Sequence, residues 1–527
     1  MNEKNEKVKF IGLTIGPIFK TLNLAKKTRQ TWTASYLFSF LMKTLIQQLL
    51  AKGIGKDQLI VPNADDIDNT AYNYGAGLYP DRLIFQASEG DFDKVKEAVH
   101  DTMQIIASGI SEKIGSPIEA VRQDLDHYIQ VYFLEQELNP SDNPILKLSP
   151  SLEVMERHSK YIHHDTHLIL PQFLQNKKPD FLSKDAKLER FESLIEIATH
   201  ELRHIDKSTY AQIQKHLFQD DKDEDETSFI QKLKETFKEE FRTYHKYIAI
   251  VQADGDNIGD AINACGTDSN ALQNFSRELT AFAREAARLI KQYGGAPVYA
   301  GGDDLLFFAP IANRFQNDAG ESISQNIFDL IDNLDNHFIQ NFPNASLSFG
   351  ISITYYKYPL NEALAEARSR LHDAKQYENK NEKKNAVAFK ILKHSGRSFG
   401  TIFYKGNRIY KRFKKVLSRY GDHQTYPEKD KYLNSIVQNL QFYRPIFKEL
   451  LENVKDPAAK RVQHFFDNSF NESIHDDYRK YINAVAKLIS DIYTTSPSSW
   501  KDEQKYQAVY AILRTLHFFN QEDDDQR

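Results

Sequence analysis

The sequence predicts an α+β protein with two ferredoxin-like units, a helical segment between them and a second helical segment at the end. Three observations carry this prediction. Residues 246–392 alternate strand-like and helix-like runs in the order β-α-β-β-α-β. Two short stretches near the N-terminus resemble strands of that unit. The 527 residues are too many for one ordinary core and suggest three or four units of about 100–200 residues.

The first half of the later unit is a strand, a helix and a hairpin. KYIAIVQADGD (246–256) alternates apolar residues as a strand does and then breaks into a Gly-Asp turn. The hairpin APVYA turns at 301–304 into LLFFA. Between the two, apolar residues recur at a spacing of three or four, which indicates one buried helical face: Leu272, Phe275, Leu279, Phe282 and Ala286.

The second half completes the order. We expect a helix near 320–340, a strand over SLSFGISIT (346–354), a further helix over about 360–377 and a closing strand at AVAFKIL. In this arrangement the first strand lies beside the hairpin between the second and third. The end of the first strand should therefore approach the hairpin turn.

The hairpin turn carries two adjacent carboxylates, Asp303 and Asp304, after Gly301 and Gly302. Two like charges about 4 Å apart repel by about 4 kcal/mol at an effective dielectric of about 20, so a cation is expected there. Asp254 at the end of the first strand would bring a third carboxylate. The sequence therefore predicts a divalent metal site, best suited to Mg²⁺. The alternative is a solvated hairpin tip.

Two ions at such a site can hold the attacking and leaving oxygens of a phosphoryl displacement. The two glycines supply the backbone freedom and close approach that the turn needs.

An N-terminal stretch looks like a second copy. KFIGLTIGP (9–17) resembles the strand at 246–254, and GLYPDRLIFQA (77–87) lies over YAGGDDLLFFA (299–309). This alignment puts Pro17 in place of Asp254 and Arg82 in place of Asp304, so we expect no metal there. Arg82 would hold either a substrate phosphate or an acid such as Asp81. Chance similarity between short apolar runs is the alternative to duplication.

Composition describes an ordinary globular chain. The 41% hydrophobic content can fill real cores, and no apolar run approaches the roughly 20 residues of a membrane span. The single cysteine, Cys265, excludes an internal disulfide framework. The start MNEKNEKVKF lacks the regions of a signal peptide, so a cytoplasmic protein is expected. With a net charge of −5, nucleic-acid binding would have to be local.

The GGDD hairpin with its Asp-Gly-Asp strand end resembles the palm domain of class III nucleotidyl cyclases and GGDEF diguanylate cyclases. It resembles most closely the large subunit of type III CRISPR effectors. The opening IGPIFKTLNLAKKTRQTWTASYLFSFL (11–41) resembles that of the type III-B, or Cmr, large subunit, whose first domain is a degenerate palm. GLYPDRLIF and SFGISITYYKYPLNEAL are also similar to that family.

The resemblance implies an enzyme of antiviral defence that makes cyclic oligoadenylates from ATP when its complex binds a target RNA. It implies other Cmr subunits, guide CRISPR RNA and target RNA as partners. Some similar proteins join AMP to S-adenosylmethionine, which stays an alternative. A free-standing diguanylate-cyclase-like enzyme and a non-catalytic scaffold subunit are further alternatives. The N-terminal resemblance and the helical tail disfavour the former, and the retained carboxylates disfavour the latter.

The resemblance also implies roles for single residues. Asp254 and Asp304 would hold two Mg²⁺ or Mn²⁺ ions with help from the Gly255 carbonyl, and Asp303 would complete the acidic cluster. Lys375 matches a position that contacts a triphosphate. Lys384 before Asn385 resembles the basic residue of the cyclase Gly-Arg-Asn element, although both lysines fit exposed helix ends equally well. The residues expected at the nucleotide are Gly255, Asn257, Gly301, Gly302, Lys375 and Lys384.

Four domains are expected. They are a degenerate palm-like domain over 1–135, a mainly helical intermediate domain over 136–240, a catalytic palm over 241–395 and a helical domain over 396–527. Many relatives begin with an HD nuclease and carry a four-cysteine zinc ribbon. This chain enters the palm-like repeat within about ten residues and has no cysteine over 136–240, so neither feature nor DNase activity is expected.

Three further motifs carry less weight. HELRH (200–204) fits a zinc-protease pattern but lacks an obvious third ligand, and IHHDTH (162–167) fits a polar loop better than a metal site. AKGIGKD (51–57) lacks the spacing of a phosphate-binding loop. The acid-free stretch 395–421 interleaves basic and aromatic residues and fits RNA contacts and an ordinary basic surface about equally.

Overall fold

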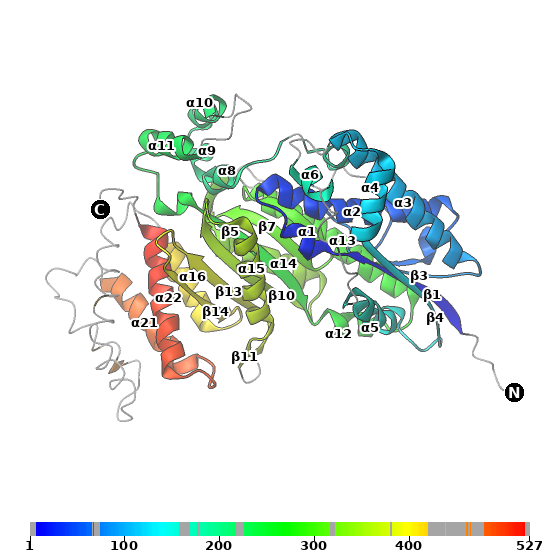
Figure 1. Ribbon diagram of the computed structural model, residues 1–527. Coiled ribbons are helices and arrows are strands. Elements are labelled where there is room, and N and C mark those ends of the chain that lie inside the picture. Colours follow the sequence, from blue (N-terminus) through cyan, green and yellow to red (C-terminus); the bar gives the residue numbers. More distant parts are fainter. Residues whose placement is uncertain are drawn as a thin grey trace.

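The computed structural model shows an N-terminal sheet, a larger second sheet and helices packed around both (Figure 1). It describes residues 7–65, 67, 74–157, 169–175, 180–188, 190–217, 226–316, 322–379, 382–419, 438, 460–461, 464 and 479–521. The segment IHHDTH lies outside these ranges. No helix in the described ranges is long and apolar enough to cross a membrane.

The N-terminal unit is a four-stranded sheet with the strand order β2-β3-β1-β4. Every neighbouring pair is antiparallel, which is the strand order of a β-α-β-β-α-β unit. Helices α2 and α3 pack against β1 and β3 through a shared apolar cluster. The elements are β1 (Val8–Gly16), α1 (Ile18–Leu22), α2 (Thr28–Ala51), η1 (Lys56–Gln58), β2 (Leu59–Val61), β3 (Arg82–Gln86), α3 (Asp91–Ile114), α4 (Ile118–Tyr128) and β4 (Gln130–Leu138).

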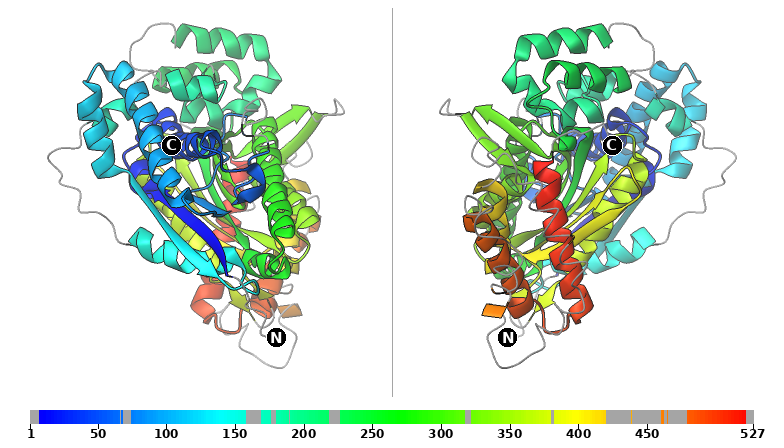
Figure 2. Two further views of the ribbon diagram at one scale, coloured as in Figure 1. Left: turned by 90° about the vertical axis from the view of Figure 1, so that its right-hand side faces the viewer. Right: turned by 90° about the vertical axis from the view of Figure 1, so that its left-hand side faces the viewer.

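The middle of the chain is helical. The predicted domain boundary at 135 falls inside β4, so the helices begin a few residues later. Helices α10 and α11 stand out above the rest of the molecule (Figure 2). The elements are α5 (Pro144–Arg157), α6 (Ile169–Gln175), α7 (Asp180–Asp185), α8 (Leu194–Ala198), α9 (His200–Ile205), α10 (Lys207–Leu217), α11 (Glu226–Thr236) and η3 (Thr243–Lys246).

The second sheet has six strands in the order β14-β13-β10-β5-β7-β6. Its part β10-β5-β7-β6 repeats the antiparallel order of the N-terminal sheet, and β13 adds in parallel to β10. The elements are β5 (Tyr247–Asp256), α12 (Ile258–Ala264), α13 (Ser269–Gln292), β6 (Ala296–Gly301), β7 (Asp304–Pro310), β8 (Ala312–Gln316), β9 (Ser322–Asn326), α14 (Ile327–Asn341), β10 (Ser346–Tyr355), α15 (Leu360–Lys375), β11 (Glu378–Asn379), β12 (Glu382–Lys383), β13 (Ala386–Leu392) and β14 (Ser398–Tyr404).

Two local predictions differ from the structure. The helix expected from about 320 begins only at Ile327, because Ser322–Asn326 pairs with β8 as a hairpin and Asn326 then caps α14. The stretch 398–404 is a strand rather than part of a helical segment. Its alternation of half-buried and buried residues suits a sheet edge, and it pairs with β13 along its whole length.

The second sheet is buried on both faces. Along β5, Ile248 and Ile250 join the cluster of the N-terminal unit, whereas Ala249 and Val251 join a cluster with α13, α14 and the C-terminal helices. One apolar core therefore continues from the N-terminal unit into one face of the second sheet. The described C-terminal helices, α16 (Arg408–Arg419), α21 (Arg479–Thr495) and α22 (Asp502–Asn520), lie at the end of the molecule away from the N-terminal sheet (Figure 1).

Candidate active site

The predicted hairpin forms at the end of the second sheet. Strand β6 ends at Gly301 and β7 begins at Asp304, and these two residues pair across the turn. Gly302 has a φ of +76°, a conformation that favours glycine. A Cβ atom added at Gly301 would lie 2.8 Å from the Cε2 atom of the Tyr299 ring. Both predicted glycines are thus required by local geometry.

Asp254 lies beside this hairpin, as predicted. Its neighbour Ala253 pairs with Leu305 on β7, so the next residues along the two strands are Asp254 and Asp304. Gly255 allows the close approach of Asp303, because a Cβ at 255 would come within 2.8 Å of the Asp303 Cβ. The three carboxylates predicted to converge are therefore brought to one end of the sheet.

The carboxylates of the hairpin are held in a charge-unfavourable setting. Burial, and then the charge of Asp254, raise the pKa of Asp303 to about 6. Burial, and then the charges of Asp303 and Asp254, raise the pKa of Asp304 well above its usual range. Asp304 nevertheless keeps solvent exposure, so it lies in a recess that solvent reaches rather than inside the core. Such a set of acids favours a bound cation.

Lys375 supplies a cation from the C-terminal end of α15. Its Nζ atom lies 2.9 Å from Asp254 Oδ1 and 3.1 Å from Asp256 Oδ1, and it donates a hydrogen bond to the Gly255 carbonyl. Burial opposes its charge, but Asp254 and Asp256 outweigh burial and raise the pKa of Lys375. Lys375 is therefore tied to the acidic cluster rather than exposed at a helix end.

Asp256 belongs to the site although it was assigned no role from the sequence. It is completely buried, and its Oδ2 atom accepts hydrogen bonds from Ser346 (2.9 Å), Ser348 (2.7 Å) and the Asn385 amide (2.9 Å). The signal was present in the sequence, since Asp256 is the second acid of the Asp-Gly-Asp motif. The serines that bind it carry no comparable signal.

The remaining predicted residues lie around this cluster. Asn257 follows β5 with a φ of +62° and begins α12. Lys384 and Asn385 also have positive φ, and the Lys384 amide donates to the Tyr377 carbonyl at 2.9 Å. Through the Asn385 amide this turn is bound to Asp256. No contact of the Lys384 side chain places it at the cluster.

The donor set fits a hard divalent ion in kind, because carboxylate oxygens and a backbone carbonyl are what Mg²⁺ and Mn²⁺ prefer. Within the described ranges, no group of three or more His, Cys, Asp or Glu side chains is arranged so that it could hold a metal ion. In this structure the Lys375 ammonium group bridges Asp254 and Asp256. Two ions at this site stay a prediction.

The N-terminal sheet ends differently at the matching place. Leu13 pairs with Leu83 as Ala253 pairs with Leu305, so Thr14, and not Pro17, matches Asp254. The alignment from sequence was shifted by three residues, because both strands are buried on both faces along most of their length and so match at several offsets. Arg82 begins β3 as Asp304 begins β7, as predicted.

Arg82 and Thr14 are bound to acids of α5. The guanidinium of Arg82 lies 3.1 Å from Glu156 and 3.6 Å from Glu153, and Thr14 Oγ1 donates to Glu156 at 2.7 Å. Of the two partners predicted for Arg82, a phosphate or an acid, the structure contains the acid. Asp81 next to it is half-buried, and this desolvation raises its pKa to about 6.

Part of the HELRH segment is built into the core, since Glu201 and Leu202 are buried whereas His204 is exposed. Glu201 accepts hydrogen bonds from Tyr244 Oη (2.7 Å), His245 Nε2 (3.1 Å) and Arg314 Nε (3.2 Å). Burial opposes the charge of Glu201, but these partners outweigh it and hold its pKa at about 2. Burial, followed by the charge of His204, lowers the pKa of His200 to about 4. A carboxylate so fully bound is not free to act as a base.

Four of the eight lysines and arginines in the basic stretch 395–421 have an acidic partner among the described residues. Arg408 and Arg412 pair with Asp491, and Lys405 pairs with Asp335 at 2.5 Å. Lys414 lies 3.1 Å from Asp329. These ion pairs hold α16 and the residues just before it against α14 and α21, which favours the structural interpretation for these four cations.

Comparison with known proteins gives two family matches. Residues 247–388 match the model of the Cas10/Cmr2 second palm domain, and residues 10–116 match that of the N-terminal domain of CRISPR-associated protein Cmr2. The CRISPR system Cmr subunit Cmr2 of Pyrococcus furiosus is 28% identical over 182 residues, covering 29% of this chain. The aligned part is 19% of that relative, so its activity as a whole protein does not transfer directly.

Solved structures share the fold. A type III-B Cmr-beta structure in the apo state matches with a TM-score of 0.57 and 12% identity, over 89% of this chain and 78% of that one. A Csm1–Csm4 cassette in complex with cA4 matches with a TM-score of 0.53 and 10% identity, over 98% and 70%. The same cassette in complex with one ATP matches with a TM-score of 0.51, also at 10% identity and over 98% and 70%.

Proposed function

We propose that the chain is a Cas10/Cmr2-type large subunit of a type III effector and transfers nucleotidyl groups from ATP, because two family models of that kind match residues 10–116 and 247–388. The observation that carries the proposal is the meeting of Asp254, Asp303 and Asp304 at one end of the second sheet, with Lys375 bound to Asp254. The cA4 and ATP complexes named for similar folds support an adenine nucleotide as substrate.

In this proposal each residue of the cluster has one task. Asp254 and Asp304, with the Gly255 carbonyl, hold two Mg²⁺ or Mn²⁺ ions, and Asp303 completes the negative field. The ions, when bound, lower the barrier to displacement at the α-phosphate. Lys375 leaves its carboxylate partners and turns its ammonium group to the triphosphate. The ion pairs that it makes in this structure keep its side chain beside the acids until substrate arrives.

Asp256 acts as a positioning residue. Its Oδ2 atom receives three hydrogen bonds, which fix the end of β5 to β10 and to the turn at 384–385. Asp254 and Gly255 precede it directly, so their direction is set by this anchor. The Asp-Gly-Asp motif thus has one acid turned toward the substrate side and one turned into the protein.

The product that the proposal favours is an oligoadenylate second messenger, made when the complex binds target RNA. A second palm-like domain is proposed for the N-terminal unit, because its strand order equals that of the catalytic unit. Its partners are other Cmr subunits, guide RNA and target RNA. The names of the similar structures mention adenine nucleotides and give no support to S-adenosylmethionine as acceptor.

The direct test replaces both hairpin acids. We expect Asp303→Ala/Asp304→Ala to lose nucleotide product by at least about 100-fold while the protein stays folded, since removing like charges from an exposed turn does not unpack a core. The purified assembly is incubated with labelled ATP, Mg²⁺ or Mn²⁺ and target RNA, and products are identified by mass. Glu239→Ala/Glu240→Ala, two adjacent exposed acids elsewhere, is the matched control. Product formation by the hairpin double variant would refute the assignment.

A further inference from the structure

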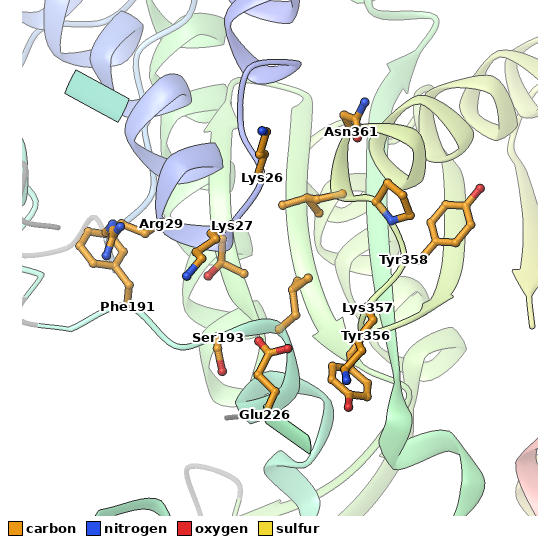
Figure 3. Close-up of a pocket in the computed structure, with 14 residues that line it drawn as sticks. Lys26, Lys27, Arg29, Phe191, Ser193, Glu226, Tyr356, Lys357, Tyr358 and Asn361 are labelled. Carbon is orange, nitrogen blue, oxygen red and sulfur yellow. The ribbon is translucent and has the colours of Figure 1, made fainter. Parts of the chain in front are cut away.

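Three hollows lie in a row where the N-terminal unit, the middle helices and the second sheet meet. The first, of about 550 Å³, is lined by the start of α2, by part of 191–194 and by 356–361 (Figure 3). The last, of about 790 Å³, lies against α9 and residues 314–315. A narrow hollow between them shares Thr28 and Phe191 with the first and Lys291 with the last. We call the three together the basic groove.

The basic groove is strongly positive in a chain that is slightly negative overall. The whole sequence has 73 acids against 68 lysines and arginines. The lining of the groove has nine lysines and arginines against two acids, Glu192 and Glu226. In Figure 3, Lys26 and Lys27 lie on one side of the first hollow, and Lys357 and Tyr358 lie on the other. Positive charge of this density on one surface favours a polyanionic ligand.

Several of these cations have no acid of their own. Among the described residues, no carboxylate forms an ion pair with the following lysines of the groove: Lys26, Lys27, Lys207, Lys291 and Lys357. This contrasts with the basic helix α16, where Arg408, Arg412 and Lys414 each have an acidic partner. Within the described residues, these lysines therefore carry charge that no carboxylate pairs with.

The shape and the aromatic residues narrow the choice of ligand. Each of the two outer hollows shares lining residues with the narrow one, and this succession suits a chain of phosphates better than one small anion. Tyr74 is 37% exposed, and Tyr74 and Phe191 both line the narrow part, where aromatic faces can stack unpaired bases. Helix α2 also begins at the first hollow with no acid in its first turn.

We propose that the basic groove binds single-stranded RNA, with the phosphates along its lysines and a base stacked in its narrow middle. The distance from the acidic cluster supports a separate role. The 16-residue helix α15 begins at the first hollow with residue 360 and ends at Lys375, so the two sites lie at opposite ends of that helix. This inference refines the RNA partnership proposed above and does not rest on the catalytic assignment.

The test measures RNA binding by the full chain. Fluorescence anisotropy follows a labelled uridine RNA of about 12 nucleotides at several KCl concentrations, a length within the range of single-strand binding sites. Lys27→Glu/Lys357→Glu changes the first hollow, and Arg203→Glu/Lys207→Glu changes the last. We expect each pair to weaken binding at least about tenfold and to lower the salt slope by about 1.4, which is two phosphate contacts on a single strand.

The control is Lys501→Glu/Lys505→Glu, which makes the same charge change at the start of α22, away from the groove. It should bind RNA within about twofold of the unaltered chain. Equal weakening by control and groove variants would reduce the effect to net charge and overturn the proposal. So would unchanged binding in both groove variants, or full competition by free ATP, which would make the groove a nucleotide pocket.

Crosslinking keeps the test decisive if a variant fails to fold. RNA containing 4-thiouridine is irradiated with the unaltered chain, and the crosslinked peptides are identified by mass. Peptides containing Tyr74 or Phe191 are expected, and crosslinks confined to other regions would contradict the groove. Asp303→Ala/Asp304→Ala should bind the RNA normally, so failure of the catalytic proposal and failure of this one give different results.

Discussion

The ends of the two sheets use one backbone plan for opposite chemistry. At the N-terminal sheet, Arg82 and Thr14 are bound to Glu156, so charges and hydrogen bonds are matched inside the protein. At the second sheet, Asp304 begins the equivalent strand directly after Asp303, and the two repel each other and Asp254. The comparison teaches that the same strand order brings the ends of the first and third strands together in both units. A few side chains then decide whether the charges at that position are paired within the protein or left unpaired.

At the end of the second sheet, Lys375 neutralises part of the negative charge. A single ammonium group serves Asp254 and Asp256 and the Gly255 carbonyl, while Asp303 and Asp304 keep their repulsion. Because these carboxylates repel each other in the free protein, a bound cation or substrate can stabilise this end of the sheet. The predictions below test this difference between the matched and the unmatched end.

The largest effect is expected for Lys375→Met. The change removes the cation that faces buried Asp256, so the free energy of unfolding should fall by about 3 kcal/mol, as for a broken buried ion pair. Nucleotide product should fall at least about 100-fold in the same variant, because a charge at the triphosphate is lost. Urea unfolding and product assays measure the two effects.

The matched control for Lys375 is Lys383→Met. Lys383 pairs only with Glu378, and about two thirds of each side chain is exposed, so little change is expected in either assay. If Lys375→Met kept full activity at unchanged stability, its contacts with the acids would have no role in the site. Loss of stability with full activity would make it a structural residue alone.

A smaller effect is expected at the matched end. Arg82→Ala should lower the free energy of unfolding by about 1–2 kcal/mol, because a half-buried guanidinium and its bonds to Glu156 are removed. Product formation should stay within a few fold. The control, Arg277→Ala, breaks an exposed pair with Asp65 and should cost less than about 0.5 kcal/mol. A rise of the KM for ATP at unchanged stability would instead make Arg82 a phosphate ligand.

Glu201 of the HELRH segment is a buried carboxylate that, unlike Asp303 and Asp304, has hydrogen-bonding side-chain partners among the described residues. The pKa of Glu201 is about 2 in the folded chain, below its ordinary value of 4.5. Its stabilising contribution is therefore present at neutral pH and is lost as the pH falls between these two values. We expect Glu201→Ala to destabilise the protein by about 3 kcal/mol at pH 7, as measured by urea unfolding, because His245 and Arg314 lose their partner. A loss below about 1 kcal/mol would contradict this.

Much of the second unit could be predicted from sequence because its elements carry motifs and apolar spacings that are local in the chain. The Asp-Gly-Asp strand end, the GGDD turn and the spacing of Leu272, Phe275 and Phe282 each indicate an element and its place. The role of Asp256 could not be predicted, because its hydrogen-bond partners come from a strand 90 residues away. The match of Thr14 to Asp254 could not be predicted because strand register is set by pairing, and two strands that are buried on both faces match at several offsets.

The smallest effect is expected for Asp304→Asn, which removes one charge and keeps the size of the side chain. Asp303 and Asp254 repel Asp304 in the absence of a metal ion, so the change should raise the melting temperature in EDTA. A gain of about 1 kcal/mol corresponds to roughly 2 °C for a chain of this size. Mg²⁺ should stabilise the unaltered protein and have less effect on the variant, since the variant offers one carboxylate fewer. Glu239→Gln, at an exposed turn, is the control and should change neither value. A lower melting temperature for Asp304→Asn in EDTA would mean that its charge is compensated in the fold, and the second sheet would then end as the first does.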